Sequence, residues 1–210
     1  LALFAMAGTV LVLIGFVAPS VLDGNNPLLV CVVAAASIAF FSLYFTHGLT
    51  VMTTVALAGT LIALGFTLGI SWIFFELANF SGFSSEESLV LPLISESLDL
   101  RGLLLGGTIL AALGALDDVT VTQAATVLEL SAQNSEMSAT QLVRSGLKIG
   151  REHIASTVNT LLLAYVGSSI PLLLLFAVSD QSLGLVANSE LISIEIVRTL
   201  CGSIGLVAAL

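Results

Sequence analysis

The sequence predicts an all-α protein, a polytopic bundle of about six transmembrane helices with about one or two interfacial or broken helices. Three observations predict this fold class. Hydrophobic residues make up 57% of the 210 residues and charged residues only 9%, whereas soluble domains carry about 25% charged residues. The mean hydropathy is +1.12. Several apolar runs also reach the roughly 20 residues that cross the core of a bilayer.

The charge balance argues against nucleic acid as a partner. The formal charge is −9, from 14 acidic and 5 basic residues, and phosphate binding requires clustered Lys and Arg. Cys31 and Cys201 lie inside apolar runs without metal-ligand spacing, so we expect inert buried thiols. We expect the lipid bilayer as the main partner and no cofactor. The residue pattern leaves open whether a metal ion binds.

The first three predicted spans cover residues 1–21, 28–45 and 49–75. The first ends near Pro19, a polar turn at 23–27 precedes the second, and a tight turn at 46–48 precedes the third. Small residues favour close packing between membrane helices. The third span contains several of them, among which are Gly59, Gly65 and Gly69.

Residues 76–100 form a predicted loop with acidic residues and no basic residue before Arg101. Within it, Ser84-Ser85-Glu86-Glu87 fits a capping box, which predicts the start of a short surface helix. The fourth segment runs from 101 to about 133, which is too long for one simple span.

A polar stretch at 134–151 follows. Its basic residues Arg144, Lys148 and Arg151 are spaced i, i+4 and i+7, so they share one helical face. Ser138 is a suitable N-cap, and we expect an interfacial helix here. The fifth span covers 152–178 with a kink at Pro171. After a loop at 180–188, the sixth span covers 191–210.

The basic residues also predict the orientation. The positive-inside rule places the segment 134–151, with its three basic residues, in the cytoplasm. The loops 76–100 and 180–188 are then external, and both ends of the chain are internal. The chain starts and ends inside apolar runs. We therefore expect one transmembrane domain over 1–210, which is the C-terminal membrane portion of a longer protein.

Two adjacent carboxylates, Asp117 and Asp118, interrupt the apolar run of the fourth segment. If Arg101 lies at the outer surface, Asp117 lies ~24 Å deeper, close to the inner edge of a core ~30 Å thick. Ionisable residues inside a membrane are costly and mark substrate or ion pathways. Alternatively, one of the two aspartates caps the helix that follows.

A polar stripe follows the two aspartates. Its members fall within ~90° of one helical face, and they are Asp118, Thr122, Thr126, Glu129 and Gln133. Two interpretations are open. The helix 119–133 lies on the membrane surface with this face toward the cytoplasm, or it continues into the bundle and the stripe lines a polar path.

The fifth span carries small and hydroxyl side chains on one face, including Thr157, Thr160 and Gly167. Such a face is typical of helix packing, and we expect it to contact the fourth segment; the alternative is a substrate path. His153 is either an interfacial residue or a proton-titrating partner of the aspartates. The candidate transport-path or ion-binding residues are Asp117, Asp118, Thr122, Gln123, Glu129, His153, Asn159 and Thr160.

Arg198 lies within the sixth span, where an unpaired guanidinium is costly. Glu195 lies three residues earlier on the same helix and is the first expected partner. The Asp117 and Asp118 carboxylates are the second. We therefore expect a buried charge pair that involves Arg198.

Enzyme signatures are weak. Intramembrane aspartyl proteases need two aspartates on two different spans, whereas the two intramembrane aspartates here are adjacent. The sequence contains no Gly-x-Ser-x-Gly motif and no P-loop. We expect the protein not to be an enzyme.

Three stretches carry a family resemblance: LDLRGLLL at 98–105, ALGALDDVTVTQ at 112–123, which runs on to 130, and GREHIASTVNTL at 150–161. With EIVRTL at 195–200, the chain resembles the YibE/F family of bacterial integral membrane proteins. The specific part covers roughly 98–167 and 190–210, and the first 95 residues match only as hydrophobic spans. The resemblance implies a multi-pass protein of the bacterial plasma membrane, described as a permease without a settled substrate.

Taken together, these features predict a permease or transporter of unknown substrate whose polar path is lined by the two aspartates. The alternative is a non-transporting membrane subunit or scaffold whose polar residues serve helix packing and partner contacts. The expected partners are the bilayer, an ion or small-molecule substrate, and a second copy of the chain or another membrane protein.

Overall fold

The computed structural model describes residues 2–83, 86–94, 98–178 and 182–210. Within these ranges the chain forms helices and no strand. Five helical segments are long and apolar enough to cross a membrane, and these are Leu3–Leu22, Pro27–His47, Val51–Leu77, Leu100–Gln133 and Glu190–Ala208. The predicted all-α polytopic bundle is thereby confirmed.

The first span is a helix with a defect in its middle. It consists of α1 (Ala2–Val12), a π-helical turn η1 (Leu13–Val17) and α2 (Ala18–Leu22). Pro19 has no backbone N–H, and its ring would clash with the carbonyl of residue 15 in a regular α-helix. The wider π turn that precedes Pro19 accommodates the proline without ending the span.

The next two helices begin with the caps that their sequences favour. α3 (Pro27–His47) has Pro27 at its first position and Asn26 as N-cap, whose side chain accepts from the Leu29 N–H. α4 (Val51–Leu77) is capped by Thr50. The expectation that glycines mediate the packing of this span is wrong for Gly65 and Gly69, which have open space beside them. The buried face of α4 carries hydroxyl side chains instead.

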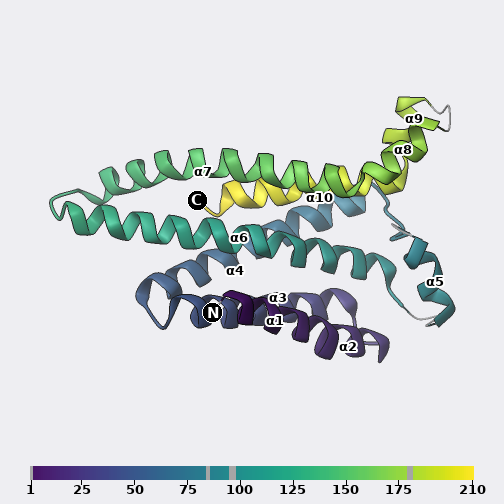
Figure 1. Cartoon of the computed structure of the whole chain (residues 1–210), viewed down its shortest axis with the longest axis horizontal. Coiled ribbons are helices and arrows are strands. Elements are labelled where there is room, and N and C mark those ends of the chain that lie inside the picture. The colour runs from purple at the N-terminus through teal and green to yellow at the C-terminus, as the bar shows by residue number, and fades with distance from the viewer. Residues whose placement is uncertain (1, 84–85, 95–97, 179–181) are drawn as a thin grey trace.

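Two helices follow the acidic loop. α5 (Glu86–Ile94) is short, and the predicted cap at Ser84-Ser85 lies outside the described residues. α6 (Leu100–Gln133) is capped by Asp99, which accepts from the Gly102 N–H. It packs against α3, α4 and α7 (Ala139–Ser168), and also against α10 (Glu190–Ala208), so it is the central helix of the bundle (Figure 1).

The course of α6 excludes one interpretation of 119–133, a separate helix that lies on the membrane surface. This segment neither turns onto the surface nor forms a separate helix, because α6 is continuous through it. At 1.5 Å per residue, α6 is ~50 Å long, which exceeds the ~30 Å hydrocarbon core. Its last turns run beside α7 and extend beyond the other helices (Figure 1).

The expected interfacial helix and much of the expected fifth span form one helix, α7. It begins with the capping box formed by Ser138 and Gln141. The helix ends at Ser168, three residues before Pro171, and α8 (Ile170–Val178) follows. The prediction of a single kinked span over 152–178 is therefore wrong, because the helix breaks there. A short α9 (Leu183–Ala187) then precedes α10.

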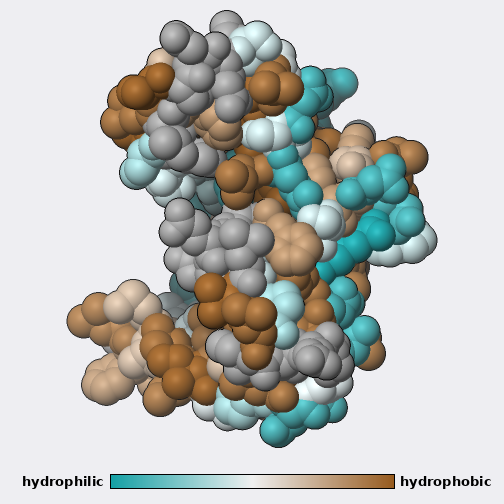
Figure 2. Space-filling view, turned by 90° about the vertical axis from the view of Figure 1, so that its right-hand side faces the viewer, coloured by the Kyte–Doolittle hydropathy of each residue, from teal (hydrophilic) through white to brown (hydrophobic). Residues whose placement is uncertain are grey.

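The connections separate to the two ends of the bundle. The helices α5, α8 and α9 lie at one end, and the connection between α6 and α7 lies at the other (Figure 1). Seen from the first end, hydrophobic residues cover much of the surface and hydrophilic residues gather mainly along one side (Figure 2). The two predicted external loops, 76–100 and 180–188, thus lie at one end of the bundle, and the basic segment lies toward the other.

Candidate functional site

The two aspartates line a cavity of about 470 Å³ between α1, α3 and α6. Polar side chains from all three helices face it, namely Thr9, Ser42, Thr46, His47, Asp117, Asp118 and Thr122. His47 is the last residue of α3, so the cavity lies at the end of the bundle where α3 turns into α4.

The Asp117 side chain turns toward the interior. It is half-buried, and its Oδ1 atom is buried without a hydrogen-bond partner among the described residues. On α4, Thr60 contacts Thr120, which lies three residues after Asp117. An unpaired carboxylate oxygen is costly in such surroundings, so this atom is a candidate ligand for a proton or a cation.

The Asp118 side chain turns toward a different neighbour. Successive residues of a helix are rotated by ~100°, and Asp118 lies next to α7 instead of α4. Its Oδ2 lies 3.5 Å from Nε2 of His153, and the side chain is 66% exposed. His153 was expected either at the membrane interface or beside the aspartates. The structure places it beside Asp118.

The buried hydroxyls of α4 are functional candidates that sequence reasoning missed. Thr53, Thr60 and Thr67 recur every seven residues, and together with Ser71 they are fully buried. Thr60 Oγ1 lies 2.6 Å from Thr120 Oγ1 on α6, directly beside Asp117. The seven-residue spacing was visible in the sequence, because residues seven apart share a helical face.

A second charged pair lies farther along the bundle. Arg198 Nη1 donates to Glu195 Oε1 at 2.7 Å, and both side chains are mostly buried, at 21% and 28% exposure. Glu195 is the partner expected first for Arg198. The two aspartates are not bonded to the guanidinium among the contacts of the described residues.

The remaining candidate residues lie away from the two aspartates. Gln123 lines another cavity, between α4, α6 and α7. Glu129 accepts from Gln133 on its own helix. Asn159 and Thr160 are exposed on the outside of α7, and the Thr160 hydroxyl bonds the carbonyl of residue 156. The site therefore contains Asp117, Asp118, Thr122 and His153, but not Gln123, Glu129, Asn159 or Thr160.

The predicted packing face of the fifth span is wrong for Thr160 and Gly167, which are both exposed. The buried face of α7 consists of Gly146, Gly150 and Ile154. A Cβ atom at Gly150 would lie 2.6 Å from Oε1 of Gln123 on α6. The two glycines thus permit the close approach that we expected from the hydroxyl residues.

The described residues contain no group of three or more His, Cys, Asp or Glu side chains that could hold a metal ion. A cation at the two aspartates would therefore be held by these carboxylates together with hydroxyl and carbonyl oxygens.

Comparison with known proteins places the chain in a family. The family described as YibE/F-like protein matches residues 1–210. The chain belongs to the YibE/F-like family. The match includes the first 95 residues, which contribute only hydrophobic spans to the resemblance seen in the sequence. No curated protein and no solved structure matches this YibE/F-like chain.

Proposed function

We propose that this YibE/F-like protein is a permease whose substrate passes Asp117 and Asp118. The observation that carries the proposal is the buried Oδ1 atom of Asp117, which lacks a hydrogen-bond partner among the described residues, in a residue that lines a polar cavity. Ionisable groups inside membrane bundles are retained at ion and substrate paths because they are costly elsewhere. The protein acts by binding and release and is not an enzyme.

The charge of the cavity favours a proton or a cation as the species that binds. Two carboxylates face one basic candidate within the cavity, His47, and His153 approaches Asp118 from α7. Each imidazole is charged only when protonated. Two acidic side chains thus outnumber the one basic side chain that lines the cavity, which favours cations over anions.

The buried hydroxyls of α4 supply a continuation of the path. Thr53 and Ser71 are separated by 18 residues along one face, or ~27 Å, nearly the thickness of the hydrocarbon core. Thr60 connects this face to α6 through its hydrogen bond with Thr120, three residues after Asp117. Oxygen atoms of Thr and Ser can replace part of the hydration shell of a cation.

The proposed orientation follows the basic segment. The end with Arg144, Lys148 and Arg151 is cytoplasmic, and the loops around α5 and α9 are external. The cavity at the aspartates then opens toward the cytoplasm of a bacterial cell. The external end carries Glu76, which pairs with Arg101 at 2.6 Å.

The test is flux into proteoliposomes with entrapped dyes for H⁺, Na⁺ and Ca²⁺. We expect Asp117→Asn to abolish flux and Asp118→Asn to reduce it, because Asn keeps the shape and removes the charge. Glu129→Gln is the matched control, since Glu129 lies on the same helix outside the cavity. Thermal unfolding of the same samples reports on folding. Wild-type flux in the folded D117N/D118N variant contradicts the proposal and favours a non-transporting subunit.

A further inference from the structure

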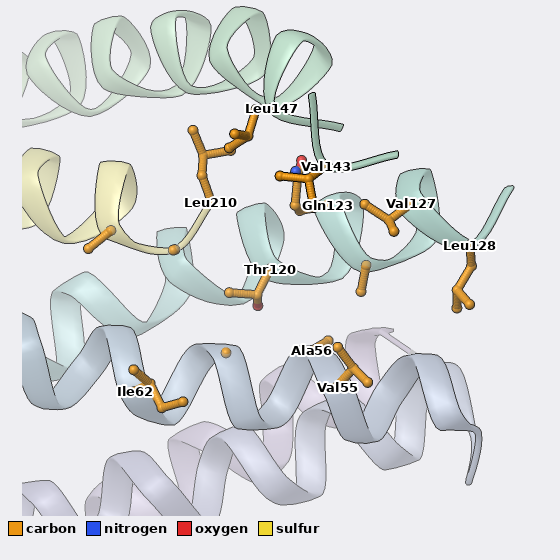
Figure 3. A pocket seen from close by; sticks show the side chains of 14 residues that line it. Val55, Ala56, Ile62, Thr120, Gln123, Val127, Leu128, Val143, Leu147 and Leu210 are labelled. Atoms are coloured by element: carbon orange, nitrogen blue, oxygen red, sulfur yellow. The ribbon is translucent and has the colours of Figure 1, made fainter. Parts of the chain in front are cut away.

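A second cavity, of about 550 Å³, lies between α4, α6, α7 and the end of α10 (Figure 3). Its volume falls within the roughly 300–1,000 Å³ typical of ligand sites. The lining is apolar apart from Thr120 and Gln123, and the Thr120 hydroxyl already donates to or accepts from Thr60. Neither aspartate lines this cavity, so it is separate from the cavity at the aspartates.

The cavity opens on the outside of the bundle, toward the end that carries the basic segment. Its residues on α4 run from Val55 to Ile62, or ~6–17 Å from the start of the helix at Val51. Val55, Ile62 and Val143 are each more than half exposed, so the cavity is continuous with the lipid-facing surface.

A basic stripe flanks the cavity on α7. Val143 and Leu147 line it, and each is followed directly by a basic residue, Arg144 or Lys148. A step of one residue rotates the side chain by ~100°, which places the basic stripe beside the lining residues on the outside of the helix. Arg151 continues the stripe one turn further.

The three basic side chains are exposed, and none is in an ion pair among the described residues. They are 3 of the 5 basic residues in a chain of charge −9. Clusters of Lys and Arg near a membrane surface attract anionic headgroups. The stripe thus presents positive charge, without an ion-pair partner among the described residues, next to an apolar cavity.

We propose that this cavity binds an acyl chain of an anionic phospholipid whose phosphate contacts Arg144, Lys148 and Arg151. The apolar lining suits the acyl chain, and the adjacent cations suit the headgroup. A second copy of the chain is a poorer occupant, because a symmetric contact at this face would bring two basic stripes together. This lipid site is proposed independently of the proposed transport function.

The test is lipid binding to the detergent-purified protein, measured by native mass spectrometry with phosphatidylglycerol and phosphatidylcholine. Wild type should retain phosphatidylglycerol preferentially. Each removed charge, in R144Q, K148Q and R151Q, should weaken binding of phosphatidylglycerol by roughly fivefold and leave phosphatidylcholine unchanged. Arg101→Gln is the charge-matched control at the opposite end of α6, and it should leave both lipids unchanged.

Ala124→Trp tests the cavity itself, because Ala124 lines it. The larger side chain should reduce retention of both lipids, while thermal unfolding shows that the variant is folded. Equal retention of the two lipids by wild type overturns the proposal. So does a phosphatidylglycerol affinity that R144Q/K148Q leaves intact, or a dimer that A124W converts to monomer, which would assign the cavity to a second copy.

Discussion

The hydroxyl oxygens of Thr60 and Thr120 lie 2.6 Å apart across the contact between α4 and α6. Each hydroxyl also lies within hydrogen-bond distance of a carbonyl on its own helix, Ala56 or Leu116. Each hydroxyl has one proton, so the hydroxyl that donates across the contact gives up its bond to its own helix, while the other can donate to its own carbonyl and accept. The contribution of the hydrogen bond between helices to stability should be small and measurable.

We expect a double-mutant cycle of Thr60→Val and Thr120→Val to give a coupling free energy of about 0.6 kcal/mol, the average for such bonds in membrane proteins. Unfolding of the protein in mixed micelles gives the four free energies. Thr160→Val is the control, since Thr160 is exposed and bonds only within α7. A coupling indistinguishable from zero would show that the intrahelical bonds satisfy both hydroxyls.

The neighbouring glycines Gly106 and Gly107 should differ in their tolerance of a methyl group. A Cβ atom at Gly106 would lie 2.6 Å from Cβ and Sγ of Cys31 on α3, whereas Gly107 has nothing within 4 Å. We expect Gly106→Ala to destabilise the protein by ~1–3 kcal/mol through overpacking. Gly107→Ala should leave the unfolding free energy unchanged or raise it slightly, because alanine favours helix. Equal effects of the two substitutions would contradict the close contact between α3 and α6.

The pair of Glu195 and Arg198 should be more sensitive to the loss of one partner than to the loss of both. Removing one partner of a fully buried ion pair costs about 3–5 kcal/mol, and an apolar replacement of both is often neutral. This pair is partly exposed, so Glu195→Gln should cost somewhat less. Glu195→Met/Arg198→Met should unfold close to wild type. The comparison is Glu76→Gln, because the Glu76 side chain is 58% exposed in its pair with Arg101, which limits the cost to ~1 kcal/mol or less.

Single-cysteine labelling in intact cells tests the orientation. In a C31A/C201A background, a cysteine in place of Phe83 should react with an impermeant maleimide, because Phe83 is exposed in the predicted external loop. A cysteine in place of Ser145 should react only after the cells are permeabilised. Reaction of the second cysteine in intact cells would reverse the proposed topology.

Sequence reasoning predicted features that depend on neighbours along the chain. The Arg198 partner is three residues away, and the Ser138 cap is local to its helix, so both follow from helix geometry alone. It failed where only the fold decides. Every face of α4 is apolar enough for lipid, so composition could not show that Gly65 faces outward and Thr67 inward. In the same way, Gly150 contacts Gln123 because α7 lies along the extension of α6, which no local pattern specified.

The segment 152–178 failed for another reason. Its length and hydrophobicity were those of a membrane span, and Pro171 predicted a kink. A proline in the first turn of a helix is well tolerated, so the chain ends α7 at Ser168 and begins a new helix with Pro171 near its start. A break and a kink have the same sequence signal.

The uninterrupted course of α6 also has a mechanical consequence. One rigid rod carries Asp117 inside the bundle and, ~24 Å further along, ends at Gln133 in the extension beside α7. Because the rod has no hinge between these points, a tilt or axial turn imposed on its protruding end is also a tilt or turn of the carboxylate. A soluble protein that bound the protruding α6–α7 hairpin would thus change the position of Asp117 without contacting it.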